Sequence, residues 1–160
     1  MSALTVDVAA DGVRVPVSLA RVAALARAVL RAERVRAAEL SITFVGRARI
    51  AALNWRHLRH RGPTDVITFE LPAAAAGQPL GGDVYIAPEV ARENATRAGV
   101  GVREEIARLV VHGVLHALGH HHPEDDARTA SPMWRRQERL LARFWPRARA
   151  SRATAEAAGR

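Results

Sequence analysis

The seven histidines of the chain fall into two short windows. One window holds His57 and His60, and the other holds His112, His116, His120, His121 and His122. His112 and His116 are four residues apart, so on a helix they share one face and both imidazoles can reach one ion. Gly119 can end such a helix with a turn that returns the chain, and a third histidine, to the same ion. The spacing predicts a metal site on a helix and the bend that follows it.

The third ligand is one of His120, His121 and His122. His122 is favoured because three residues after Gly119 give the chain enough reach, which leaves His120 and His121 to support the ligands or face the substrate. The second ring nitrogen of a ligand needs a hydrogen-bond acceptor of its own. The candidate acceptors are Asp65, Asp125 and Asp126.

Three neutral imidazoles leave the fourth position of a tetrahedral zinc ion open, which is typical of a catalytic site. Such an ion lowers the pKa of bound water to about 7 and polarises a phosphoryl or carbonyl oxygen. The chain has no cysteine, so a metal site must use histidines and carboxylates. We therefore expect one divalent ion, zinc, at His112, His116 and His122.

Zinc peptidases with this histidine spacing need a glutamate directly after the first histidine as general base. Gly113 stands at that position. A zincin-like peptidase is therefore disfavoured, whereas phosphodiester cleavage is less affected because water or the 2′-hydroxyl of RNA can attack.

A second cluster, residues 54–65, sets arginines beside an aromatic ring. Arg56, Arg59 and Arg61 could bind phosphates while Trp55 stacks on a base. The alternative is that Trp55 belongs to the core and the arginines form a solvated rim. Taken together, the residues favour RNA binding by Arg56, Arg59 and Arg61.

The length of 160 residues, 49% of them hydrophobic, fits one globular domain. Arginine supplies all 24 basic residues against 16 acidic ones, and the net charge is +8. Guanidinium groups match phosphates bidentately, so this surface favours a nucleic-acid partner. No signal peptide or membrane span is evident, and we expect a cytoplasmic protein that does not act at a membrane.

Hydrophobic periodicity predicts an α+β fold, in which one small mixed four-stranded sheet packs with about five helices. The expected strands are residues 4–8, 40–45, 66–69 and 83–86, and the expected helices are 19–36, 50–57, 88–98, 104–118 and 132–144. Prolines and glycines predict a loop at 71–82. We expect a single metal-dependent hydrolase domain at 1–146, with its metal site at the end of a core helix, and a disordered Arg- and Ala-rich tail at 147–160.

The chain resembles the YbeY-type endoribonucleases, also called rRNA maturation factors, over about residues 35–145. The signature His-Gly-x-Leu-His-x-x-Gly-x-x-His of that family matches residues 112–122. Further similar segments are Leu53-Asn54, Pro63–Phe69, Gly82–Glu89 and Arg108–Val111.

The resemblance implies a zinc site at His112, His116 and His122, cleavage of single-stranded RNA, 3′-end maturation of small-subunit (16S) rRNA, and ribosome quality control. The implied partners are rRNA, ribosomal proteins and a ribosome-associated GTPase. The chain departs from the family in two places: many members have Tyr-Asp where it has His120-His121, and a functional arginine where it has Leu58. Arg59 is the candidate to take over that catalytic role. A metal-stabilised, non-catalytic RNA-binding module for ribosome assembly is the main alternative function.

Overall fold

The computed structural model describes residues 3–147, so most of the predicted tail at 147–160 lies outside the described residues. Its sheet has four strands: β1 (Ala3–Ala10), β2 (Ala37–Phe44), β3 (Val66–Leu71) and β4 (Leu80–Ile86). They lie in the order β1-β2-β4-β3, and β3 is antiparallel to its neighbour while the other pairs are parallel. The predicted small mixed sheet is confirmed, and β3 forms one edge of it.

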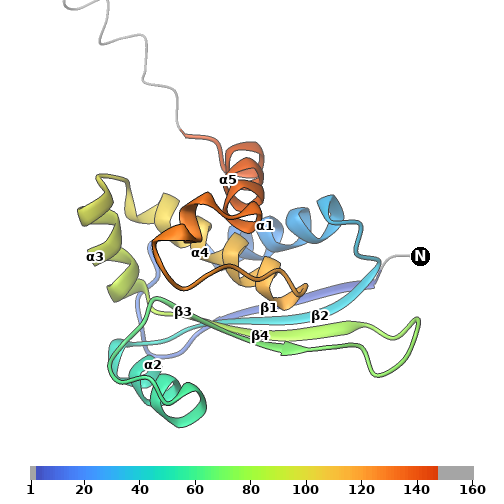
Figure 1. The fold of residues 1–160 in the computed structure, drawn as a ribbon, viewed down its shortest axis with the longest axis horizontal. Coiled ribbons are helices and arrows are strands. Elements are labelled where there is room, and N and C mark those ends of the chain that lie inside the picture. The colour runs from blue at the N-terminus through green and yellow to red at the C-terminus, as the bar shows by residue number, and fades with distance from the viewer. Residues whose placement is uncertain (1–2, 148–160) are drawn as a thin grey trace, which may run out of the picture.

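Five α-helices accompany the sheet in the described part of the chain. They are α1 (Leu19–Ala32), α2 (Arg47–Leu53), α3 (Pro88–Ala98), α4 (Val102–Ala117) and α5 (Pro132–Phe144). Figure 1 shows α1, α4 and α5 over one face of the sheet and α2 beneath the other. No described helix has the length and apolar character needed to cross a membrane.

Helix α4 is the central helix of the fold. It packs against α1, α3, α5 and the strands β3 and β4. Most of its side chains are buried, including Ile106, Val110, Val114 and Leu115. Because so many elements hold α4, its side chains have fixed positions.

Two glycines allow α4 to lie close against the sheet. A Cβ at Gly113 would come within 2.6 Å of Val84 Cγ1, and a Cβ at Gly82 would come within 2.8 Å of the Ala117 side chain. Position 113 thus faces the sheet, with no room for the glutamate that a zinc peptidase of this spacing requires. The geometry explains why a glycine follows the first histidine.

We expect Gly113→Ala to lower the free energy of unfolding by up to about 2 kcal/mol. Overpacking a tight contact costs about 1–3 kcal/mol, and alanine returns about 1 kcal/mol of helix propensity. Val84→Ala removes the methyl groups that the new Cβ would meet. Urea unfolding should therefore show a smaller cost of Gly113→Ala in the Val84→Ala background, and an equal cost in both backgrounds would contradict this packing.

Candidate metal centre

The end of α4 is shaped to return the chain toward the helix. Gly119 adopts a left-handed φ of +90°. Its N–H donates to the carbonyl of His116 at 2.9 Å, and the N–H of His120 donates to the carbonyl of Leu115 at 3.0 Å. This pair of bonds is the Schellman motif, which favours glycine at its left-handed position. The turn brings His122 back beside α4, as the sequence spacing predicts.

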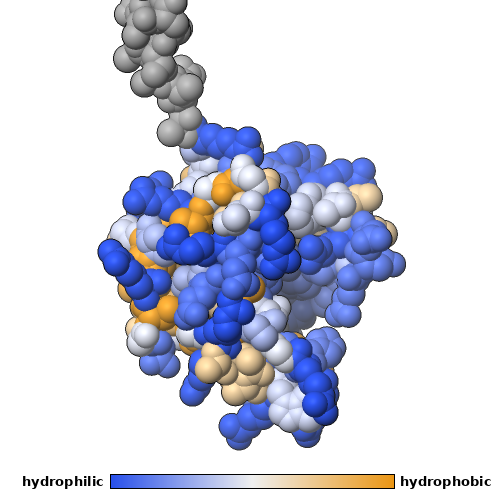
Figure 2. All heavy atoms as spheres, turned by 90° about the vertical axis from the view of Figure 1, so that its left-hand side faces the viewer, coloured by the Kyte–Doolittle hydropathy of each residue, from blue (hydrophilic) through white to orange (hydrophobic). Residues whose placement is uncertain are grey.

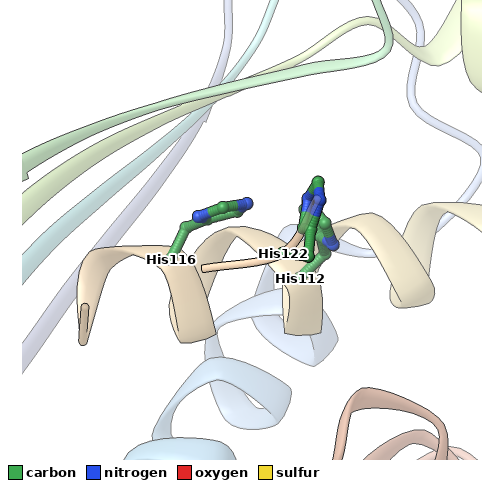
Figure 3. Close-up of side chains that lie close together, drawn as sticks. All are labelled: His112, His116 and His122. Atoms are coloured by element: carbon green, nitrogen blue, oxygen red, sulfur yellow. The ribbon is translucent and has the colours of Figure 1, made fainter. Parts of the chain in front are cut away.

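The structure brings the imidazoles of His112, His116 and His122 together. Figure 3 shows the three rings gathered on the side of α4 that faces the strands. The ring centroids lie 4.6–5.0 Å apart. One nitrogen from each ring falls within 4.8 Å of the other two, so the group could hold a metal ion.

Hydrogen bonds at the outer nitrogens set the ring tautomers. Nδ1 of His122 lies 2.7 Å from the carbonyl oxygen of Pro123, which can only accept, so this nitrogen carries the proton. Nδ1 of His112 likewise lies 2.7 Å from Oε1 of Gln137. In the neutral rings, both Nε2 atoms are therefore unprotonated acceptors that face the centre of the group.

The unprotonated Nε2 atoms of His112 and His122 lie 3.4 Å apart. Neither can donate to the other, so two lone pairs face each other without a proton between them. Two Zn–N bonds of about 2.05 Å at a tetrahedral angle would place their nitrogens about 3.3 Å apart. The donor set and its spacing therefore fit a tetrahedral divalent ion.

A chain of buried and partly buried polar groups holds His112 in this orientation. Gln137 of α5 is 1% exposed, and its Nε2 donates to Glu138 at 3.3 Å, which directs its Oε1 to His112. Glu138 in turn accepts from Arg108 at 3.1 Å. Hydrogen bonds thus connect His112 of α4, through two residues of α5, to Arg108 of α4.

Two of the three carboxylates expected to support the ligands have other partners. Asp125 accepts the N–H of Ala127 at 3.0 Å, and Asp65 accepts from Asn94 at 3.0 Å. Gln137 and the carbonyl of Pro123 take the expected role. Gln137 could have been found from the sequence, because it interrupts the apolar stripe of α5 formed by Met133, Leu140 and Leu141.

Burial keeps the rings of His112 and His116 neutral. It is the largest cause that lowers the pKa of His116 to about 4, and the neighbouring histidines act in the same direction. Burial also lowers the pKa of His112, against the opposing effect of the Gln137 hydrogen bond. Neutral imidazole is the form that binds metals, so these rings are ready for an ion at neutral pH.

We expect the metal-free protein to lose stability as the pH falls from about 6.5 to about 4. An unfolded histidine has a pKa of about 6.5, while that of folded His116 is about 4. In this window the unfolded chain binds more protons, so the stabilisation is complete above the window and lost on descending through it. Thermal unfolding of chelator-treated protein across this window should show a steeper decline for wild type than for His116→Gln, and equal slopes would contradict the expectation.

The other two histidines of the cluster face acidic side chains. Nε2 of His120 lies 3.6 Å from Glu33, and Nε2 of His121 lies 3.7 Å from Glu70 of β3. His121, Glu70 and His116 form a second group that could hold an ion. Its members are more exposed than those of the first group. Since His116 belongs to both groups, experiments must separate them through His121 and His122.

The arginine cluster lies beside α2, on the sheet face away from α4 (Figure 1). Residues Asn54–Leu58 form a short π-helix, η1. Trp55 is 45% exposed, and the guanidinium carbons of Arg59 and Arg61 lie 5.6 and 5.2 Å from its ring centroid. Trp55 is therefore not a core residue.

One part-buried hydrogen bond and one aromatic contact position this cluster. Asn54 is 5% exposed, and its side chain donates to the carbonyl of Gly62 at 3.0 Å, which holds the loop after η1. His57 packs edge-on against Phe69 of β3, with ring centroids 5.1 Å apart. Figure 2 shows this end of the molecule, where hydrophilic side chains surround smaller hydrophobic patches. The arginines that line the space beside His112 are instead Arg108 and Arg128.

Comparisons with known proteins agree with this geometry. A family model described as "Endoribonuclease YbeY" matches residues 10–145. A protein of that name from Thermobifida fusca is 40% identical over 147 residues, covering 87% of this chain and 93% of the relative. One from Beutenbergia cavernae is 41% identical over 138 residues, covering 81% of this chain and 91% of the relative. A solution structure of a Thermotoga maritima protein matches the fold with a TM-score of 0.60 at 22% identity, over 88% of this chain and 89% of that one.

Proposed function

The chain belongs to the YbeY endoribonuclease family, and from this premise we propose that it is a zinc-dependent endoribonuclease specific for single-stranded RNA. It acts in the cytoplasm, in 3′-end maturation of small-subunit (16S) rRNA and in ribosome quality control. Its partners are that rRNA, ribosomal proteins and a ribosome-associated GTPase.

The observation that carries the metal-dependent activity is the pair of unprotonated Nε2 atoms of His112 and His122, 3.4 Å apart, with His116 beside them. A bound divalent ion supplies Lewis acidity to a phosphoryl oxygen and activates water. The three imidazoles hold and orient that ion, while Gln137 and the Pro123 carbonyl keep the protons on the outer nitrogens.

Arginines supply the remaining positive charge. Arg56, Arg59 and Arg61 bind the phosphates of the strand, and Arg59 is the first candidate to neutralise charge that develops on the scissile phosphate. Arg128, which lines the space beside His112, is a second candidate for that neutralising role. The cleavage rates of Arg59→Ala and Arg128→Ala separate the two: the larger loss of kcat identifies the arginine that acts on the phosphate.

End-group analysis of cleaved RNA tests the activity and its route. Zinc-loaded protein should cut single-stranded RNA, a chelator should stop it, and added zinc should restore it. A 2′,3′-cyclic phosphate would assign the attack to the 2′-hydroxyl, whereas a 5′-phosphate on the downstream product would assign it to water. Purified, zinc-loaded protein that leaves single-stranded RNA intact would contradict the proposed function.

A non-catalytic RNA-binding assembly module is a second candidate, because α4 packs against three helices and two strands and an ion on it could stabilise the fold. His116→Ala separates the two functions. Loss of cleavage with retained folding and RNA binding supports the enzyme. Unfolding of the variant, combined with a wild type that does not cut RNA, supports the module.

A further inference from the structure

A cavity of about 410 Å³ lies beside His112, between α3, α4, α5 and the start of β3. His112 lines it and also belongs to the metal triad, so the cavity and the triad share one imidazole ring. The volume falls within the range typical of small-molecule sites and exceeds that of one nucleobase. The cavity is therefore large enough to take part of a bound nucleotide.

The charges around the cavity disfavour a phosphate inside it. Asp65, Glu105 and Glu138 line it. The lining cation Arg108 is already held by Glu104, Glu105 and Glu138 at 2.8–3.2 Å. Because these carboxylates repel an anion and Arg108 has no unmatched charge, a neutral ligand fits the interior better. Exposed Arg128 supplies positive charge among the lining residues.

The walls of the cavity suit a flat ligand that donates hydrogen bonds. Trp134 of α5 contributes a half-buried ring, with the guanidinium carbon of Arg128 5.7 Å from its centroid. Oδ2 of Asp65 accepts from Asn94 at 3.0 Å. The contact of its Oδ1 with Thr64 is 3.5 Å long, at the limit of a hydrogen bond. Oδ1 can thus accept a hydrogen bond from a ligand in the cavity.

We propose that this cavity binds a nucleobase adjacent to the scissile phosphate. The base stacks on Trp134 and donates a hydrogen bond from its amino group to Asp65. Adenine, cytosine and guanine carry such an amino group. Uracil has no amino group, and its one N–H between two carbonyl oxygens is a poor match because the carboxylate of Asp65 repels those oxygens. The site therefore selects amino-bearing bases over uracil, an inference that rests on the proposed RNA-cleaving function.

Nucleotide binding to metal-free protein tests the cavity without requiring cleavage. Titration with AMP, CMP, GMP and UMP, followed by NMR shifts of the backbone amides that line the cavity, should show UMP binding about three- to tenfold more weakly than the others. Trp134→Leu should weaken all four about tenfold. Asp65→Asn should remove most of the preference, because an amide can both donate and accept. Equal affinities, or no binding of any nucleotide, would overturn the proposal.

Cleavage mapping on single-stranded RNAs, uniform except at one varied base, provides the second readout. The base preference should disappear in Asp65→Asn. It should persist in the control Trp55→Leu, because Trp55 lies on η1 and does not line the cavity. If the protein cuts RNA but shows no base preference, or one that Asp65→Asn leaves unchanged, the cavity assignment is overturned and the proposed function stands. Protein that prefers AMP over UMP but never cuts RNA overturns the proposed function instead and leaves the cavity assignment standing.

Discussion

Replacing His122 with alanine is expected to lower zinc affinity by about two to three orders of magnitude. If three protein ligands share a zinc-binding free energy of about 10 kcal/mol, each ligand contributes roughly 3 kcal/mol. His122 supplies one of the facing Nε2 atoms, so the ion loses a ligand that no neighbouring group replaces in the same geometry. RNA cleavage at limiting zinc should fall by the same factor, because only loaded protein is active.

His121→Ala is the matched control for this variant. His121 is exposed and adjacent in sequence, but it belongs to the alternative group with Glu70 and His116. It should change zinc affinity less than about threefold, since it is not in the triad. Competition titrations with a zinc-binding dye measure both variants. A large loss of zinc affinity in His121→Ala, with normal affinity in His122→Ala, would show that the ion binds to the Glu70 group instead.

Replacing Gln137 with leucine should weaken zinc binding about 10- to 100-fold without removing a ligand. Partners at the outer nitrogen of a zinc-binding histidine fix its tautomer and orientation, and their loss has effects of this size. Gln137 is buried and its Oε1 lies 2.7 Å from Nδ1 of His112. Leucine fills similar space but cannot accept a hydrogen bond from Nδ1, so the His112 ring can rotate or exchange tautomers.

Gln137→Glu keeps an acceptor at this position and should retain zinc affinity near that of wild type. Zinc titrations should be paired with urea unfolding, because a purely structural role for Gln137 would change stability and affinity together. Wild-type affinity in Gln137→Leu would show that the hydrogen bond does not orient the ligand.

Much of the fold follows from local sequence patterns. Strand alternation and helix caps predict the elements to within a few residues, and the glycine turn predicts the returning third histidine. The first predicted helix runs to Arg36 but ends at Ala32, because Arg34 adopts a left-handed φ of 60° and the N–H of Val35 bonds to Leu30. A Schellman turn without glycine leaves no sequence signal.

The predicted loop at residues 71–82 is shorter in the structure. Strand β4 already begins at Leu80 and includes Gly81 and Gly82, which a sequence pattern assigns to a turn. Gly82 is in the strand because α4 approaches the sheet there, with Ala117 in the space of its missing Cβ. Such a contact joins residues far apart in sequence, so no local pattern reveals it.

The surroundings of the metal centre also depend on long-range packing. Gln137 reaches His112 only because α5 packs on α4. The cavity beside His112 exists only where α3, α4, α5 and β3 meet. The sequence predicts which side chains can bind an ion, whereas the fold determines which groups hold them and which base can lie beside them.

The most direct test of the central claim is an anomalous difference map, measured at the zinc edge, from crystals grown with one equivalent of zinc. We predict a single strong peak within about 2.1 Å of an imidazole nitrogen of each of His112, His116 and His122. A peak held by Glu70 and His121 instead, or no peak at the triad, would contradict the account.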